Sequence, residues 1–198
     1  MKKYLTAIIM IPLLFGAVYF AKAQSMYSIT PSKSNEMKLS GTSSLHDWEM
    51  ESKTFTSEAE FCMTPELSTH LSALKSLSFT LPVVDLKGDK SGLNNNAYEA
   101  LHSDKYKNIG YTQVSAIVFE EKLGKTTIKS TGNLTIAGTT KEVVLDVLCI
   151  VNPDATITCS GSQKLQMSDY KVVPPSFMFG AMKTGNDIAL DFTVVYKQ

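Results

Sequence analysis

The sequence predicts an all-β domain that forms a single barrel or sandwich, and two observations carry this prediction. The first is a hairpin pattern in residues 131–147, where apolar residues occupy every second position on both sides of a turn at residues 138–141. The alternating residues are Leu134, Ile136, Val143, Leu145 and Val147. Alternation of this kind is typical of β-strands with one apolar face. The sheet must therefore cover that face with another layer or curl around it.

The second observation is the number of strand-like segments, which alternate or are rich in β-branched and aromatic residues. They are residues 27–30, 37–42, 48–50, 58–63, 77–84, 109–119, 126–136, 143–151, 157–166 and 188–196. Segment 188–196 is the most regular of them. We expect this terminal strand to close the sheet.

Two segments interrupt the β pattern. Residues 94–104 begin with asparagines that favour a helix cap and continue with apolar residues at helical spacing, which predicts a short surface helix between two strands. Pro174 and Pro175 precede Phe177, Met178 and Phe179, which predicts an irregular apolar loop. This loop, together with Tyr170, either lines a ligand entrance or seals one end of the domain.

The N-terminal segment has the features of a secretory signal peptide. A basic start at Lys2 and Lys3 leads into an apolar run over residues 4–20, and Ala21-Lys22-Ala23 fits a cleavage site. We therefore expect a signal peptide over residues 1–23, a mature domain over residues 24–198, and a periplasmic or secreted location. The alternative is an uncleaved membrane anchor, because the apolar run just reaches spanning length.

The charge pattern argues against nucleic acid as a partner. All 19 basic residues are lysine, and Lys2, Lys3 and Lys22 leave with the leader, so the mature domain has a net charge of −3. Arginine, whose planar fork binds phosphate and guanine in a bidentate way, does not occur in the sequence.

Three cysteines, Cys62, Cys149 and Cys159, lie in a chain that we expect to be exported, where disulfides are permitted. A turn at residues 152–155 would place Cys149 and Cys159 opposite each other. Two interpretations remain open: a cross-strand disulfide, or two small buried thiols. The second is favoured, because cysteines directly opposite each other on neighbouring strands often have awkward geometry for a disulfide.

The sequence gives no signal for an enzyme or a bound metal. His46, His70 and His102 lie in no metal-binding or nucleophile motif, and no Cys/His cluster suggests zinc. His46 and Asp47 adjoin Trp48, but neighbouring strand residues point to opposite faces and cannot share a site. We expect no catalytic residues, no metal and no cofactor, and for His46 we keep contact with a ligand head group as the alternative to a structural role.

Lys141, in the turn after residue 138, has two interpretations. It could attract an anionic head group, but turn chemistry alone explains a lysine and threonines at that place.

Three stretches of the chain stand out by their order and spacing: NNAYEALHSDKYKNIGY at residues 95–111, TGNLTIAGTTKEVVL from residue 131, and SDYKVVPPSFMFGAMKTGNDIALDF from residue 168, with GTSSLHDWEM near the start. Together they resemble the bacterial YceI-like family of exported, lipocalin-like, polyisoprenoid-binding proteins. The resemblance covers nearly the whole mature chain. It implies an extended antiparallel eight-stranded barrel that holds an isoprenoid or related amphiphile in its interior.

Strand alternation would line such a barrel with apolar side chains, which either bind a narrow ligand or simply fill the core. Our candidates for the lumen are Trp48, Phe61, Phe79, Leu81, Ile109, Tyr111, Phe119, Leu134, Ile136, Val143, Leu145, Val147, Phe177, Phe179, Leu190, Phe192 and Val194. The favoured function is binding of a polyprenyl or quinone-like lipid for sequestration or transport, with transient membrane contact and a homodimer as further expectations. The alternatives are an envelope structural or stress-associated interaction protein with a filled core and no ligand, and, ranked last, an enzyme that acts on a lipid.

Overall fold

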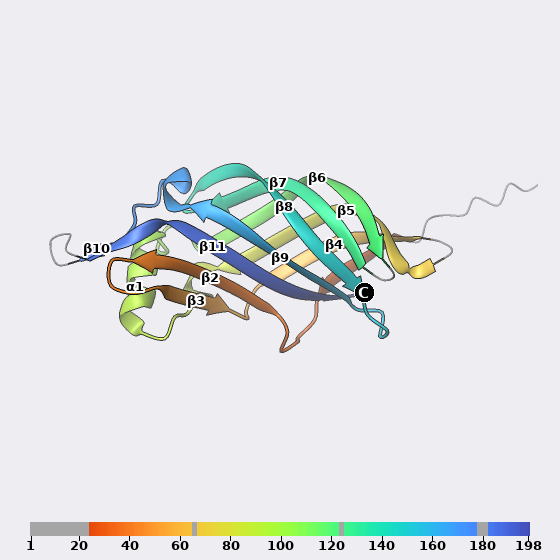
Figure 1. Ribbon diagram of the computed structural model, residues 1–198, viewed down its shortest axis with the longest axis horizontal. Helices are drawn as coiled ribbons and strands as arrows, with labels where there is room; N and C mark the ends of the chain where they lie inside the picture. Colours follow the sequence, from red (N-terminus) through yellow and green to blue (C-terminus); the bar gives the residue numbers. More distant parts are fainter. Residues whose placement is uncertain (1–23, 65–66, 123–124, 178–181) are drawn as a thin grey trace, which may run out of the picture.

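The computed structural model describes residues 24–64, 67–122, 125–177 and 182–198, in which all ten predicted strands occur (Figure 1). The signal-peptide prediction lies outside these residues. The strands are β1 (Gln24–Ile29), β2 (Glu36–Ser43), β3 (Trp48–Ser52), β4 (Thr56–Thr64), β5 (Leu67–Pro82), β6 (Asn108–Lys122), β7 (Lys125–Ile136), β8 (Thr139–Val151), β9 (Ile157–Gln166), β10 (Ser176–Phe177) and β11 (Met182–Lys197).

Among the described residues, eight strands form a closed antiparallel ring in the order β1, β4, β5, β6, β7, β8, β9 and β11. The last strand closes it, since Ile29 pairs with Tyr196 and Ser28 pairs with Lys197. The eight-stranded barrel and the closing role of the terminal strand are therefore confirmed. β2 pairs with β11 next to β1, and β3 pairs with β2, so these two strands extend the wall at one end.

The β7–β8 hairpin is tighter than the sequence suggested. Ile136 pairs with Thr139, which leaves Ala137 and Gly138 as the two turn residues, with φ of 47° and 75°. Positive φ at both positions is the mark of a type I′ turn, whose twist matches that of the strands. Thr139, Thr140 and Lys141 consequently belong to β8 and not to the turn.

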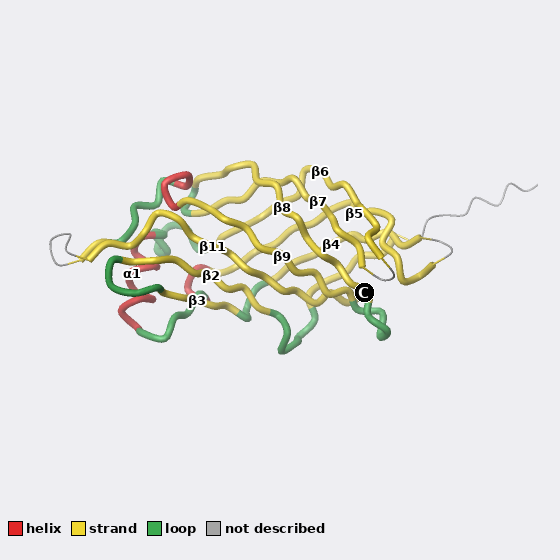
Figure 2. Tube along the Cα trace, viewed as in Figure 1, coloured by secondary structure: helices red, strands yellow, loops and turns green. Residues whose placement is uncertain are grey.

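The helical elements gather at one end of the barrel, where Figure 2 shows them in red. They are η1 (Val83–Asp85), α1 (Ser91–Ala100) and η2 (Met167–Tyr170). The predicted helix exists but begins three residues earlier, and the asparagines do not cap it, because Asn94 lies inside α1 and accepts a hydrogen bond from Gly88 N at 2.6 Å. In the described part of the chain, no helix is both long and apolar enough to span a membrane.

The core follows the period-two pattern most clearly on β7, where Thr126, Ile128, Ser130, Leu134 and Ile136 are all buried. At the end away from α1, three aromatic rings close the barrel. Phe61 packs edge-on against Tyr27 and against Tyr196, with ring centroids 5.4 and 5.5 Å apart. The hydroxyl of Tyr196 is 2.7 Å from that of Ser57, so its polar end is also satisfied.

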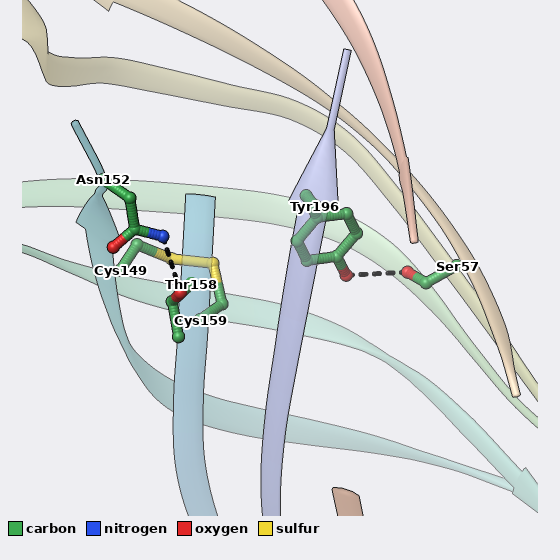
Figure 3. The surroundings of a disulfide bond; sticks show 6 residues. All are labelled: Ser57, Cys149, Asn152, Thr158, Cys159 and Tyr196. Atoms are coloured by element: carbon green, nitrogen blue, oxygen red, sulfur yellow. Dashed lines mark hydrogen bonds between the residues drawn. A yellow bond between two sulfur atoms is a disulfide. The ribbon is translucent and has the colours of Figure 1, made fainter. Parts of the chain in front are cut away.

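Cys149 and Cys159 are joined by a disulfide, which decides between the two readings of the sequence (Figure 3). Their strands pair in direct register, and the loop between them is held by Asn152, whose side chain donates to the hydroxyls of Thr156 and Thr158 at 2.9 and 2.8 Å. Hydrogen bonds from the Thr156 hydroxyl and backbone N–H lower the pKa of Asp154 in the same loop. Cys62 is a buried free thiol.

Candidate functional site

The barrel encloses a cavity of about 160 Å³, which we call the central cavity. Twelve of the predicted lumen residues line it: Phe61, Phe79, Leu81, Ile109, Tyr111, Leu134, Ile136, Leu145, Val147, Leu190, Phe192 and Val194. The ring strands β4 to β9 and β11 contribute to the lining, because alternation turns one face of each strand inward. The surface of this hollow is almost entirely hydrocarbon.

Polar groups on the central cavity are few. The Tyr111 hydroxyl is 2.7 Å from the hydroxyl of Ser130, so this buried pair satisfies itself. Burial raises the pKa of Tyr111, and the hydrogen bond with Ser130 partly opposes that shift. Gln163 also lines the cavity, and its amide nitrogen donates locally to the backbone oxygen of Lys164 at 3.1 Å.

Sequence reasoning missed about half of the lining. The missed residues are Met37, Leu39, Leu74, Leu77, Leu86, Leu101, Ile128, Ser130, Cys159, Gln163, Leu165, Ile188 and Tyr196. For Ile128 and Ser130 a signal was present, since counting back in twos from Leu134 reaches both. For Leu86 and Leu101 it was not, because their position depends on how the segment from η1 to α1 folds over the barrel end.

A second cavity of about 100 Å³ lies beneath α1 and is bounded by Leu93 and Ala97 of that helix. We call it the helix-end cavity. It shares four lining residues with the central cavity, namely Leu39, Leu101, Ile136 and Ile188. These four side chains thus lie between two apolar hollows, one inside the ring of strands and one beneath α1.

Three of the predicted lumen residues, Trp48, Val143 and Phe119, lie away from the central cavity. Trp48 lies on β3, outside the closed ring, and packs over Gly41 of β2; it borders the helix-end cavity instead. Val143 packs in the cluster around Tyr170 and borders a groove on the outer surface. Phe177 belongs to β10, but its side chain and the whole of Phe179 lie outside the described part of the structure.

The prediction that Phe119 lines the lumen is wrong, because this residue is 52% exposed to solvent. The register between β6 and β7 shifts between Gln113 and Ser115. A bulge of this kind inserts one residue and reverses which side chains face inward beyond it. Ala116 and Val118 accordingly pack against the core, while Phe119 points to solvent.

The outer groove is a larger hollow, of about 1020 Å³, bordered by parts of β2, β3, β8, β9, η2 and β11. Lys141 and Tyr170 both border it, whereas His46 does not. Burial raises the pKa of Tyr170 to about 12, and nearby Asp169 adds to the shift. The Nδ1 atom of the exposed His46 ring lies 2.8 Å from the backbone oxygen of its neighbour Asp47.

The central and helix-end cavities can bind a guest by removing its apolar surface from water. Within the described residues, no three His, Cys, Asp or Glu side chains gather where they could hold a metal ion. An apolar guest would gain about 25 cal/mol per Å² of surface removed from water.

Solved structures with the same fold come from several bacteria. BcnA of Burkholderia cenocepacia matches with a TM-score of 0.60 and 18% sequence identity, over 80% of this chain and 95% of that one. A YceI protein of Campylobacter jejuni matches with a TM-score of 0.53 and 22% identity, over 72% and 81%. A polyisoprenoid binding domain from Saccharophagus degradans matches with a TM-score of 0.62 and 9% identity, over 86% and 97%.

No curated protein matches this sequence. The family comparison is decisive, since the model of the YceI-like domain matches residues 27–196, from the first strand of the ring to the end of its last. The chain therefore belongs to the family of YceI-like domains.

Proposed function

We propose that this protein is an exported lipid-binding barrel that holds the tail of an isoprenoid lipid or related polyprenyl or quinone-like amphiphile, for sequestration or transport. The observation that carries the proposal is the central cavity, with its nearly continuous hydrocarbon lining inside a closed ring of strands. The name of the Saccharophagus degradans domain, which shares this fold, agrees with such a ligand. The proposal includes no catalytic step.

The size of the cavity limits what can bind without rearrangement. A hollow of about 150 Å³ is large enough for benzene, whereas drug-sized ligands occupy pockets of about 300–1,000 Å³. A volume of about 160 Å³ therefore takes a short piece of an isoprenoid tail. A longer tail must displace the side chains that separate the central cavity from the helix-end cavity, and that displacement reduces the net gain from burial.

Export is supported by two features. The first is the leader-like pattern of residues 1–23, with its basic start, its apolar run and its small residues at the expected cleavage site. The disulfide between Cys149 and Cys159 suits an oxidising compartment. Cell fractionation and the intact mass of the purified chain test this part. A mass that corresponds to a chain beginning at Gln24 agrees with export, and a full-length chain in the cytoplasm contradicts it.

Extraction tests ligand binding directly. Protein purified from its native host is extracted with organic solvent, the extract is analysed by mass spectrometry, and the emptied protein is titrated with geranylgeraniol under native conditions. We expect one prenyl lipid per chain. Vesicle flotation and sedimentation then test the expected membrane contact and homodimer.

The small volume of the central cavity favours one second candidate, a structural or stress-associated envelope protein with a filled core. If the extract contains no lipid and the protein does not bind added prenyl alcohols, this candidate is supported and lipid binding is rejected. Crosslinking in intact cells would then be expected to recover a protein partner.

A further inference from the structure

The barrel wall splits between β8 and β9. Pairing between these strands joins residues 147–151 to residues 157–161. The remaining half of β8, residues 139–146, stays paired with β7, and the remaining half of β9, residues 162–166, stays paired with β11. Figure 1 shows the two ribbons running apart toward the end where η2 lies. We call the space between these two halves the β8–β9 split.

The outer groove and the central cavity meet at this split. Residues 141–144 of β8 and 163–166 of β9 border the groove from its two sides. Gln163, Leu165 and Ile188 border both the groove and the central cavity. A layer one side chain thick thus separates the interior from a hollow that opens to solvent.

The two ends of the barrel offer less room. The rings of Tyr27, Phe61 and Tyr196 pack edge-on at one end, and Leu93, Ala97 and Leu101 of the helix segment pack against the core at the other. Since protein interiors are close-packed, opening either end would displace many contacts at once. At the split, the described side chains that border both groove and cavity are those of Gln163, Leu165 and Ile188.

The chemistry of the split suits a molecule with a polar head and an apolar tail. Gln163 faces inward, opposite Leu190 in the β9–β11 ladder, and it brings an amide into a lining that is otherwise almost all hydrocarbon. An amide both donates and accepts hydrogen bonds, so it can hold a hydroxyl or a carbonyl group. A hydrocarbon tail alone would need no such group.

The charges of the groove argue against an anionic head. Five carboxylates border it, those of Asp47, Glu49, Glu142, Asp169 and Asp187. Glu49 is held by Lys38 at 2.8 Å, which leaves four acidic groups against Lys141 and Lys164. A phosphate or pyrophosphate would therefore enter a site with an excess of negative charge, and the chain contains no arginine to bind it.

We propose that the β8–β9 split is the lateral portal of the barrel, through which the tail of an isoprenoid enters while its uncharged head group, a hydroxyl or a quinone-like carbonyl, stays beside Gln163 at the groove. This inference rests on the proposed function and adds the route of entry and the class of head group. The first test uses the unaltered protein and a geranylgeraniol analogue that carries a photoreactive diazirine at its head. We expect crosslinks at residues 141–144 or 163–166. Crosslinks at Val172, Pro175 or Thr184, beside the helix-end cavity, would overturn the portal.

The second test compares Gln163→Phe with Ser162→Phe, which changes the exposed neighbour on the opposite face of β9. Association of geranylgeraniol is followed by stopped flow through the single tryptophan, Trp48, which borders both the groove and the helix-end cavity. We expect Gln163→Phe to slow association at least tenfold and Ser162→Phe to leave it unchanged. If both variants are folded, with unchanged circular dichroism, and associate at the wild-type rate, the portal is wrong.

The head-group class is tested with two probes that share one tail, geranylgeraniol and geranylgeranyl monophosphate, at low salt. We expect the alcohol to bind at least tenfold more tightly, and equal or tighter binding of the monophosphate would overturn this part. Failure of the wild-type protein to bind either probe would instead reject the proposed function itself.

Discussion

Cys149 on β8 and Cys159 on β9 face each other directly across the ladder, with Cα atoms 4.2 Å apart and a disulfide between them. Two residues farther along, at the pair Val147 and Gly161, the ladder ends and the strands separate. The covalent bond thus holds the strands together close to the base of the β8–β9 split. On one side of this point β8 and β9 are paired and joined by the disulfide, and on the other side they are not paired with each other.

Reduction of this disulfide is expected to lower the free energy of unfolding by about 2–3 kcal/mol, the loop-closure value for a crosslink of this length. The two cysteines are 10 residues apart in sequence. Chemical denaturation with and without a thiol reductant measures the change. The double variant Cys149→Ala/Cys159→Ala is the control, because the reductant should then have no effect; an equal effect on both proteins would contradict the prediction.

Gly161→Ala is expected to destabilise the fold by about 1–3 kcal/mol, since overpacking costs about this much. A Cβ at this position would lie 2.9 Å from the backbone oxygen of Asp146 and 2.6 Å from the Phe192 ring. Gly110→Ala is the matched control, because its Cβ would meet only the Phe79 backbone oxygen at an ordinary 3.7 Å. Thermal unfolding of both variants checks this, and an equal loss would show that strand glycines in general, rather than this close approach, set the cost.

Ile136→Ala should connect the central cavity with the helix-end cavity, since Ile136 is one of the four side chains between them. Its removal is expected to cost about 2–4 kcal/mol of stability and to shift preference toward longer prenyl alcohols. Competition between farnesol and geranylgeraniol measures the preference. Ile117→Ala removes the same atoms from a side chain that is 57% exposed, so it should change neither property; an unchanged preference in Ile136→Ala would argue against a tail that crosses this partition.

Stability should fall between about pH 10 and pH 12 because of Tyr196. Burial raises its pKa to about 12, and the hydrogen bond with Ser57 opposes part of the shift. The unfolded chain loses this proton near pH 10 while the folded chain keeps it, so the stabilisation is complete below pH 10 and disappears as the pH rises toward 12. The difference corresponds to about 2–3 kcal/mol.

Tyr196→Phe provides the control for this pH dependence. The Ser57 hydroxyl keeps its hydrogen bond to the backbone oxygen of Ser78 at 2.6 Å, so the variant should still fold. Denaturant titrations at pH 9 and pH 11.5 should show a smaller loss in the variant than in the wild type. Identical losses would mean that other groups cause the alkaline transition.

The sequence predicted the strands well because alternation is local, but it did not predict all of them at full length. Residues 67–76 extend β5 by ten positions without clear alternation, and they pair with β4 through several register shifts. Here the partner strand imposes the extended conformation on a segment with weak preferences of its own. The prediction for Phe119 was wrong for a related reason. The bulge that turns this side chain outward leaves no recognisable pattern in the sequence of β6.

The sequence predicted that the candidate site is an apolar lumen, but it did not predict all the residues that line it or the split in its wall. Inward-facing residues such as Leu134 and Val194 follow from counting in twos along a strand. The β8–β9 split does not, because it depends on where two ladders of different length end. The regularity of residues 188–196 predicted that the terminal strand closes the sheet, but it did not predict that Tyr196 would pair with Ile29, because the partner of a strand is not encoded in its own pattern.

Methyl NMR of the protein with labelled isoleucine, leucine and valine, titrated with geranylgeraniol, tests the central claim most directly. We predict shift changes, saturating at one lipid per chain, at the cavity methyl groups of Ile128, Leu134, Val147 and Val194, and none at the exposed Val114 and Ile117. Shifts confined to the exposed methyl groups, or no shifts at saturating lipid, would contradict the account.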